Sequence, residues 1–154
     1  MRLTKRFIVK SLDELELSPS IRYERYYINE NLRVQKKENI LEKEVLNDQN
    51  EWIEKVKISN KEFEALKSQA NQKIIRDSYL YLKDKRVSIK KYLEKFSGLN
   101  RVEVKFNTTE ELENYQKESW MGKEITSTPL AFDKDLSKLT QNEFINELRK
   151  ALKD

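Results

Sequence analysis

Several short segments of the sequence place charged side chains at every second position. In RVEVKF, the residues Arg101, Glu103 and Lys105 occupy one face of the implied strand, and apolar residues occupy the other. LRVQKK repeats the alternation, with Arg33 opposite its apolar residues. Guanidinium groups suit phosphate oxygens, and carboxylates suit Mg²⁺ or Mn²⁺. These residue types can therefore bind an anion or a metal, provided that the charged faces line a cavity.

The alternation alone leaves two interpretations of the charged faces open. In an antiparallel sheet, polar faces are usually solvated and apolar faces form the core. Alternatively, helices cover the apolar faces on the outside of a barrel, and the charged faces line its interior.

Composition restricts the chemistry. The chain has 154 residues, 31 of them Lys or Arg and 27 Asp or Glu, and a formal net charge of +4. We expect a single domain over residues 1–154. The small excess of positive charge suits an anionic ligand but makes nucleic-acid binding unlikely. Cysteine and histidine are absent, which excludes disulfides, thiolate metal sites and the commonest general base. Any metal site would use oxygen ligands.

Apolar runs of the length that a membrane span needs are missing from the sequence. The basic start turns acidic without a long apolar stretch, so neither a membrane partner nor a secretory signal is expected. The default expectation is a soluble, cytoplasmic protein.

The elements expected around these residues are mostly short strands. Segment 11–19 is expected to be a connection with room for a helical turn. Three helices are predicted from capping boxes that pair Ser59 with Glu62, Thr108 with Glu111 and Thr140 with Glu143. The predicted strands are 2–9, 20–28, 32–37, 39–46, 51–58, 73–82, 86–93 and 100–106. This pattern predicts an α+β, mainly β fold: a closed or nearly closed antiparallel barrel of about eight strands, packed outside by a few helices including a C-terminal one.

Three motifs occur in order in the second half of the chain: GLNRVEVKF, TTEELENY and WMGKEIT. Together they resemble the glutamate-bearing strand, the short helix and the Trp-x-Gly-x-Glu-[Val/Ile]-Thr signature of the CYTH domain, or triphosphate tunnel superfamily. The resemblance spans most of the chain and is strongest over residues 74–126. LRVQKK and ISNKEFEAL resemble the family's basic strand and mid-domain helix more loosely.

The resemblance implies an eight-stranded antiparallel barrel that forms a tunnel. In the family, inward-facing Arg and Lys bind a triphosphate, and inward-facing glutamates hold Mg²⁺ or Mn²⁺ beside it. Members hydrolyse inorganic triphosphate, thiamine triphosphate or RNA 5′-triphosphates, or cyclise ATP.

This sequence departs from the family pattern where the metal would be held. The first-strand motif Glu-x-Glu-x-Lys is replaced by Arg2, Thr4 and Arg6. The family's Arg-x-Arg becomes Arg33-x-Gln35.

The later strands depart in the same direction. A Lys-x-Arg pair becomes Arg76-x-Ser78, and the aspartate expected after Ser-Ile is Lys90. The late Glu-x-Glu becomes Glu103-x-Lys105. Because cations replace carboxylates, the interior suits an anion without a metal, and weakened or lost catalysis is expected.

Glu103 and Glu124 are the metal ligands that the family pattern retains. Alternatively, Glu103 is the ion-pair partner of Lys105, Lys90 or Arg76. Glu42 and Glu44 either replace the lost carboxylates or are ordinary strand charges. The tyrosine-rich segment 22–27 packs against a helix or stacks on a nucleobase. The residues expected to bind the anion are Arg2, Arg6, Arg33, Arg76, Lys90 and Lys105; no catalytic residue is assigned.

Three functions are compatible with these residues. The first is binding of a phosphate-rich small molecule (triphosphate, nucleotide or polyphosphate) in a basic tunnel, with catalysis weakened or lost. The second is an active Mg²⁺- or Mn²⁺-dependent triphosphatase. The third is a pseudoenzyme scaffold for a protein partner. A homodimer is compatible with each.

Overall fold

The alternating segments of the sequence form a single antiparallel sheet. The computed structural model describes residues 3–49 and 51–153. All eight predicted strands are confirmed, with ends that differ by at most two residues. The strands are β1 (Thr4–Ile8), β2 (Ile21–Asn29), β3 (Leu32–Lys37), β4 (Ile40–Leu46), β5 (Trp52–Lys57), β6 (Gln72–Leu80), β7 (Val87–Tyr92) and β8 (Asn100–Lys105).

The strands follow the order β1-β8-β7-β6-β2-β3-β4-β5, so β1 and β5 are the two ends of the sheet. Hydrogen bonds between β1 and β5 do not close the sheet in the part of the chain that the structure describes. The sheet is nevertheless curved, because residues from all eight strands line one cavity. The mainly β, nearly closed barrel architecture expected from the sequence is therefore confirmed.

The outer edge of β1 is covered by the segment of the WMGKEIT motif. The Ile125 amide donates to the Arg6 carbonyl at 2.8 Å, and the Gly122 amide donates to the Ile8 carbonyl at 2.7 Å. A Cβ atom at position 122 would lie 2.9 Å from that carbonyl oxygen. The glycine of the motif is therefore required by the close approach of the two backbones.

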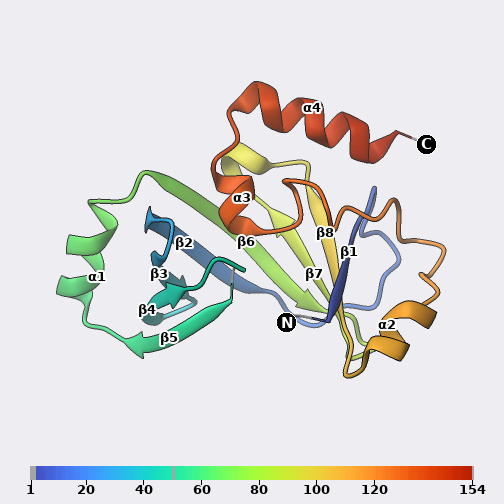
Figure 1. The fold of residues 1–154 in the computed structure, drawn as a ribbon, viewed down its shortest axis with the longest axis horizontal. Helices are drawn as coiled ribbons and strands as arrows, with labels where there is room; N and C mark the ends of the chain where they lie inside the picture. The colour runs from blue at the N-terminus through green and yellow to red at the C-terminus, as the bar shows by residue number, and fades with distance from the viewer. Residues whose placement is uncertain (1–2, 50, 154) are drawn as a thin grey trace.

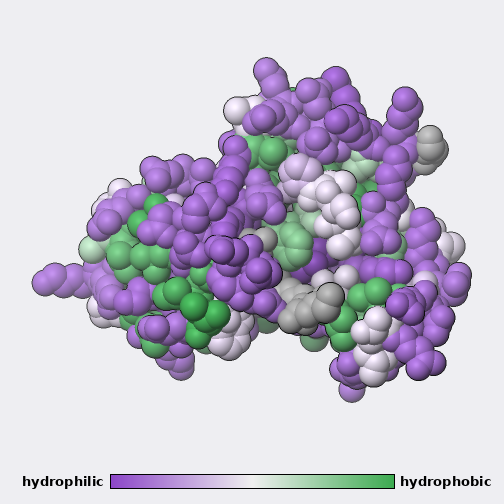
Figure 2. Space-filling model, viewed as in Figure 1, coloured by the Kyte–Doolittle hydropathy of each residue, from purple (hydrophilic) through white to green (hydrophobic). Residues whose placement is uncertain are grey.

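The three predicted helices are confirmed and pack outside the sheet (Figure 1). α1 (Asn60–Lys67) packs on β2, β3 and β4, where Phe63 contacts Tyr26 edge to face at 6.0 Å. α2 (Thr109–Asn114) and α4 (Gln141–Leu152) begin at their predicted caps. The surface in Figure 2 is largely hydrophilic, as the high charged fraction requires. No helix in the described residues is long and apolar enough to cross a membrane.

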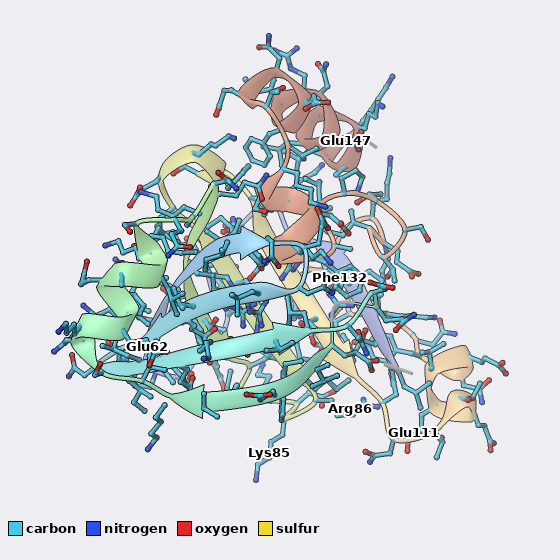
Figure 3. The ribbon with its side chains drawn as sticks, turned by 60° about the vertical axis from the view of Figure 1, so that its left-hand side comes forward. Glu62, Lys85, Arg86, Glu111, Phe132 and Glu147 are labelled. Carbon is cyan, nitrogen blue, oxygen red and sulfur yellow. The ribbon has the colours of Figure 1, made fainter. Side chains whose placement is uncertain are left out.

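Two helical segments were not predicted: the 3-10 turn η1 (Glu94–Phe96) and α3 (Asp133–Ser137). The connection 11–19 contains a turn rather than a helix. α3 contacts β6, and Leu136 of this helix belongs to an apolar cluster with α4 and the ends of several strands. This cluster closes one end of the curved sheet. Figure 3 shows Phe132 at the start of α3, on the concave side of the sheet.

Candidate functional site

The concave face of the sheet encloses a cavity of about 480 Å³. The charged faces of the strands point into it, and most apolar side chains lie on the opposite faces, where they pack against helices and connecting segments. The second interpretation of the alternation is therefore correct. Three of the residues that line the cavity are carboxylates: Glu44, Glu103 and Asp133. Nine are cationic: Arg6, Arg25, Arg33, Lys55, Arg76, Lys90, Arg101, Lys105 and Lys134.

Asp133 lies at the closed end of the cavity, where α3 inserts it among the strand residues. Its Oδ2 accepts from Arg25 at 2.9 Å and from Arg76 at 2.9 Å. Its Oδ1 accepts from Arg101 at 3.2 Å and from the Tyr92 hydroxyl. Burial alone would raise the pKa of Asp133, but the three guanidinium groups and the hydroxyl overcome it and hold this pKa well below its usual range.

Glu44 organises a second set of cations on β3 and β5. The guanidinium of Arg33 donates to both of its carboxylate oxygens, at 3.1 and 3.2 Å, and the Lys55 ammonium lies 3.6 Å away. Arg33 also donates to the Tyr27 hydroxyl at 3.1 Å. Burial opposes ionisation of Glu44, but Arg33 and its other cationic neighbours lower the pKa. Glu44 is thus a charged partner of Arg33, whichever of the two predicted roles it has.

Glu103 lies on β8 opposite Arg6 of β1, and their charged groups are 3.5 Å apart. Burial would raise the pKa of Glu103, but Arg6, Lys90, Arg101 and Lys105 lower it to about 2. The structure shows an ion pair for Glu103, but with Arg6 and not with the predicted partners Lys105, Lys90 or Arg76.

Lys90 and Lys105 differ from the other cations of the cavity. Lys90 donates to the Ser88 hydroxyl at 3.0 Å, and neither lysine has an ion pair within the described residues. Burial, together with the nearby charge of Arg76, lowers the pKa of Lys90 to about 7. Lys90 therefore places a largely buried positive charge in the cavity without a carboxylate partner among the described residues, whereas Lys105 is exposed.

The sequence identified most of the cationic lining. Arg6, Arg33, Arg76, Lys90 and Lys105 all line the cavity. Arg2 lies outside the described residues.

Sequence reasoning missed Arg25, Arg101 and Asp133 as site residues. Arg25 and Arg101 could have been found, because each lies at an alternating position on a predicted strand and shares the charged face. Asp133 could not, since it belongs to a short helix with no periodic pattern and reaches the site only through the tertiary fold.

The structure confirms helix packing for part of the tyrosine-rich segment, and stacking on a nucleobase stays a prediction. Tyr26 packs against α1, whereas Tyr23 lines the cavity, with the Arg76 guanidinium 4.5 Å from its ring centre. Trp52 also lines the cavity and is about half exposed. Two aromatic rings are thus available beside the cationic groups.

The residues present do not fit a divalent metal ion. Glu103 lines the cavity, but Glu124 is exposed on the segment that pairs with β1 and is not part of the lining. Among residues 3–49 and 51–153, no group of three or more acidic side chains is placed to hold a metal. Each carboxylate of the lining is paired with Arg or Lys, so a divalent cation would meet cations in place of vacant oxygen ligands.

Solved structures that are similar to this chain include two crystal structures of NE1496. That of the inorganic triphosphatase NE1496 has a TM-score of 0.74 and 17% sequence identity, and the match covers 91% of this chain and 96% of that one. That of the hypothetical protein NE1496 has a TM-score of 0.73 and 16% identity, covering 89% and 97%. No family model matches the sequence, and no curated protein matches it. At these identities the similarity shows the fold alone: this chain has the fold of those structures, as the resemblance to the triphosphate tunnel superfamily predicted.

Proposed function

We propose that this chain binds a phosphate-rich anion in its basic cavity without a divalent metal, and that hydrolysis is weakened or lost. The ligand class comprises triphosphate, nucleotides and polyphosphate. One observation carries the proposal: nine cationic side chains and only three carboxylates line the cavity. An excess of buried positive charge is unfavourable unless an anion compensates it.

The residue types suit phosphate oxygens. Guanidinium groups form paired, charge-assisted hydrogen bonds with them, and ammonium groups act as point charges. The lowered pKa of Lys90 supports this use of the cavity. Burial disfavours the charged ammonium of Lys90, and a bound anion would favour it again. The shared fold supports the same ligand class, since one similar structure is an inorganic triphosphatase.

Weakened hydrolysis is supported by the state of the carboxylates. Metal-assisted phosphoryl transfer relies on ions that bridge phosphate oxygens and neutralise developing charge. In this cavity Glu44, Glu103 and Asp133 each hold protein cations. Lys90 and Lys105 can neutralise phosphate charge, but they supply no metal-bound nucleophile and no bridging metal ion.

Titration calorimetry with sodium triphosphate, in EDTA and then in Mn²⁺, tests the proposal, with phosphate release measured in parallel. We expect binding in EDTA that Lys90→Met weakens. The matched control is Lys85→Met, because Lys85 is exposed outside the cavity (Figure 3). The control should bind as the wild type does.

Two results would contradict the proposal. Phosphate release that requires Mn²⁺ and disappears in Glu103→Ala would establish an active triphosphatase. Absence of binding to triphosphate, ATP and polyphosphate alike would favour a scaffold for a protein partner.

A further inference from the structure

Asp133 already behaves as an anion bound inside the cavity. Its two carboxylate oxygens accept hydrogen bonds from Arg25, Arg76, Arg101 and Tyr92, two donors to each oxygen. Only 5% of its surface is exposed. The three guanidinium groups best suited to phosphate at this end therefore have a carboxylate where phosphate oxygens would otherwise bind.

This carboxylate is held in place by its helix. Leu130 before α3 and Leu136 within it are completely buried in the apolar cluster that closes the cavity. The ring of Phe132 lies 4.1 Å beneath the guanidinium of Arg6. Withdrawal of Asp133 would expose this apolar surface to water, so we treat the carboxylate as a fixed part of the cavity.

Cationic groups continue from this closed end toward the mouth. Along β8, Arg101 is followed on the same face by Glu103 and Lys105, which pair in register with Arg6 and Thr4 of β1. At the spacing of an antiparallel strand, the Cα atoms of Arg101 and Lys105 are about 13 Å apart. The cavity thus has an inner part, occupied by Asp133, and an outer part farther along the strands.

The outer part is defined by the side chains of Arg6, Lys90, Lys105 and Glu103, which are three cations and one carboxylate. Lys90 lies at its inner limit, because it pairs in register with Arg101. Its formal excess of positive charge is about two, which is close to the charge of one phosphoryl group at neutral pH. A longer anion that extended toward the inner arginines would meet the negative charge of Asp133 and donors that are already in use. If it extended toward β3 and β5, it would meet Arg33 and Lys55, which are paired with Glu44.

We propose that Asp133 is the specificity-determining residue of the cavity: it removes the inner arginines from ligand binding and restricts the site to an anion that presents one or two phosphoryl groups to the outer part. The inference rests on the proposed function, whose ligand class it narrows from phosphate-rich anions in general to phosphomonoesters and diphosphates. Triphosphate gains little from its third phosphoryl group.

The test compares orthophosphate, diphosphate and triphosphate by titration calorimetry in EDTA. In the wild type, triphosphate should bind within about threefold of diphosphate. In Asp133→Asn, the guanidinium groups become available, and triphosphate should gain about tenfold or more over diphosphate, as expected for one or more new charge-assisted hydrogen bonds. Asp135→Asn is the matched control, because this residue of the same helix makes none of these contacts.

Each outcome is decisive. A wild-type preference for triphosphate over diphosphate of more than about tenfold, or an unchanged ratio in Asp133→Asn, overturns the inference and leaves the proposed function intact. Failure of all three anions to bind contradicts the proposed function itself. If Asp133→Asn folds only with ligand, the concentration of each anion that restores folding is measured: rescue by less triphosphate than diphosphate supports the inference, and equal rescue overturns it.

Discussion

Both ends of the cavity contain cationic side chains, but those at the inner end are paired with a carboxylate and two of those at the outer end are not. At the inner end, three arginines surround Asp133 and each is paired with it at 3.2 Å or less. At the outer end, Lys90 and Lys105 have no ion pair with any described residue. Residues of the same curved sheet line both ends. The ends differ in ion pairing because α3 inserts the carboxylate of Asp133 at the inner end.

This contrast separates stability from ligand binding. Paired buried charges are required for folding, because removal of one partner leaves the other desolvated and uncompensated. Unpaired buried cations are unfavourable in the ligand-free protein and are relieved by an anion from solution. Substitutions at the inner end should therefore reduce stability, and substitutions at the outer end should reduce binding.

The largest effect is expected on removal of the inner carboxylate. Asp133→Ala leaves three buried arginines without their shared counter-charge and should lower the free energy of unfolding by about 3–5 kcal/mol. Urea denaturation monitored by circular dichroism measures this change. Asp135→Ala should change it by about 0.5 kcal/mol or less; comparable losses in the two variants would show that the inner cluster has no special role.

The outer end should respond in the opposite way. Lys90→Met removes an uncompensated cation, so we expect affinity for a diphosphate to fall about tenfold while the free energy of unfolding is unchanged or higher. Calorimetry and denaturation on the same preparation measure the two quantities. Loss of stability with unchanged affinity would reverse the roles that we assign to the two ends.

Anion binding should also depend on pH through Lys90. Burial lowers its pKa to about 7, with contributions from Arg76 and Arg101, while Glu103 and Asp133 act in the opposite direction. A lysine with a lowered pKa is charged below that pKa and neutral above it. Affinity should therefore fall several-fold, by about 1 kcal/mol, between pH 6 and 8.5, and anion binding above pH 7 should take up a proton.

Lys90→Arg distinguishes this effect from titration of the ligand. Arginine stays charged over the whole range, so the variant retains only the pH dependence of the anion. Identical pH profiles for the wild type and Lys90→Arg would exclude Lys90 as the titrating group.

The alternation of the sequence predicted the sheet and its cationic face well, because each depends on local spacing. Arg33, Arg76 and Lys90 could be placed by the period of a strand together with the family resemblance. The inner cluster could not, since Asp133 is 32 residues or more from each arginine that it contacts. Its position depends on how the segment after the WMGKEIT motif packs into one end of the cavity, which no local pattern encodes.

The smallest effect on stability is expected for an arginine–aspartate ion pair that lies in solvent, which can be compared with the buried pairs of Asp133. Arg22 and Asp77 pair on the outer face between β2 and β6, where the Arg22 side chain is 49% exposed. Water and salt screen such a pair, so Asp77→Ala should lower the free energy of unfolding by less than about 1 kcal/mol. Denaturation at low and high salt measures this loss, which should shrink as salt is added, whereas the loss in Asp133→Ala should persist. Equal salt dependence in the two variants would mean that burial does not distinguish the inner cluster from a surface ion pair.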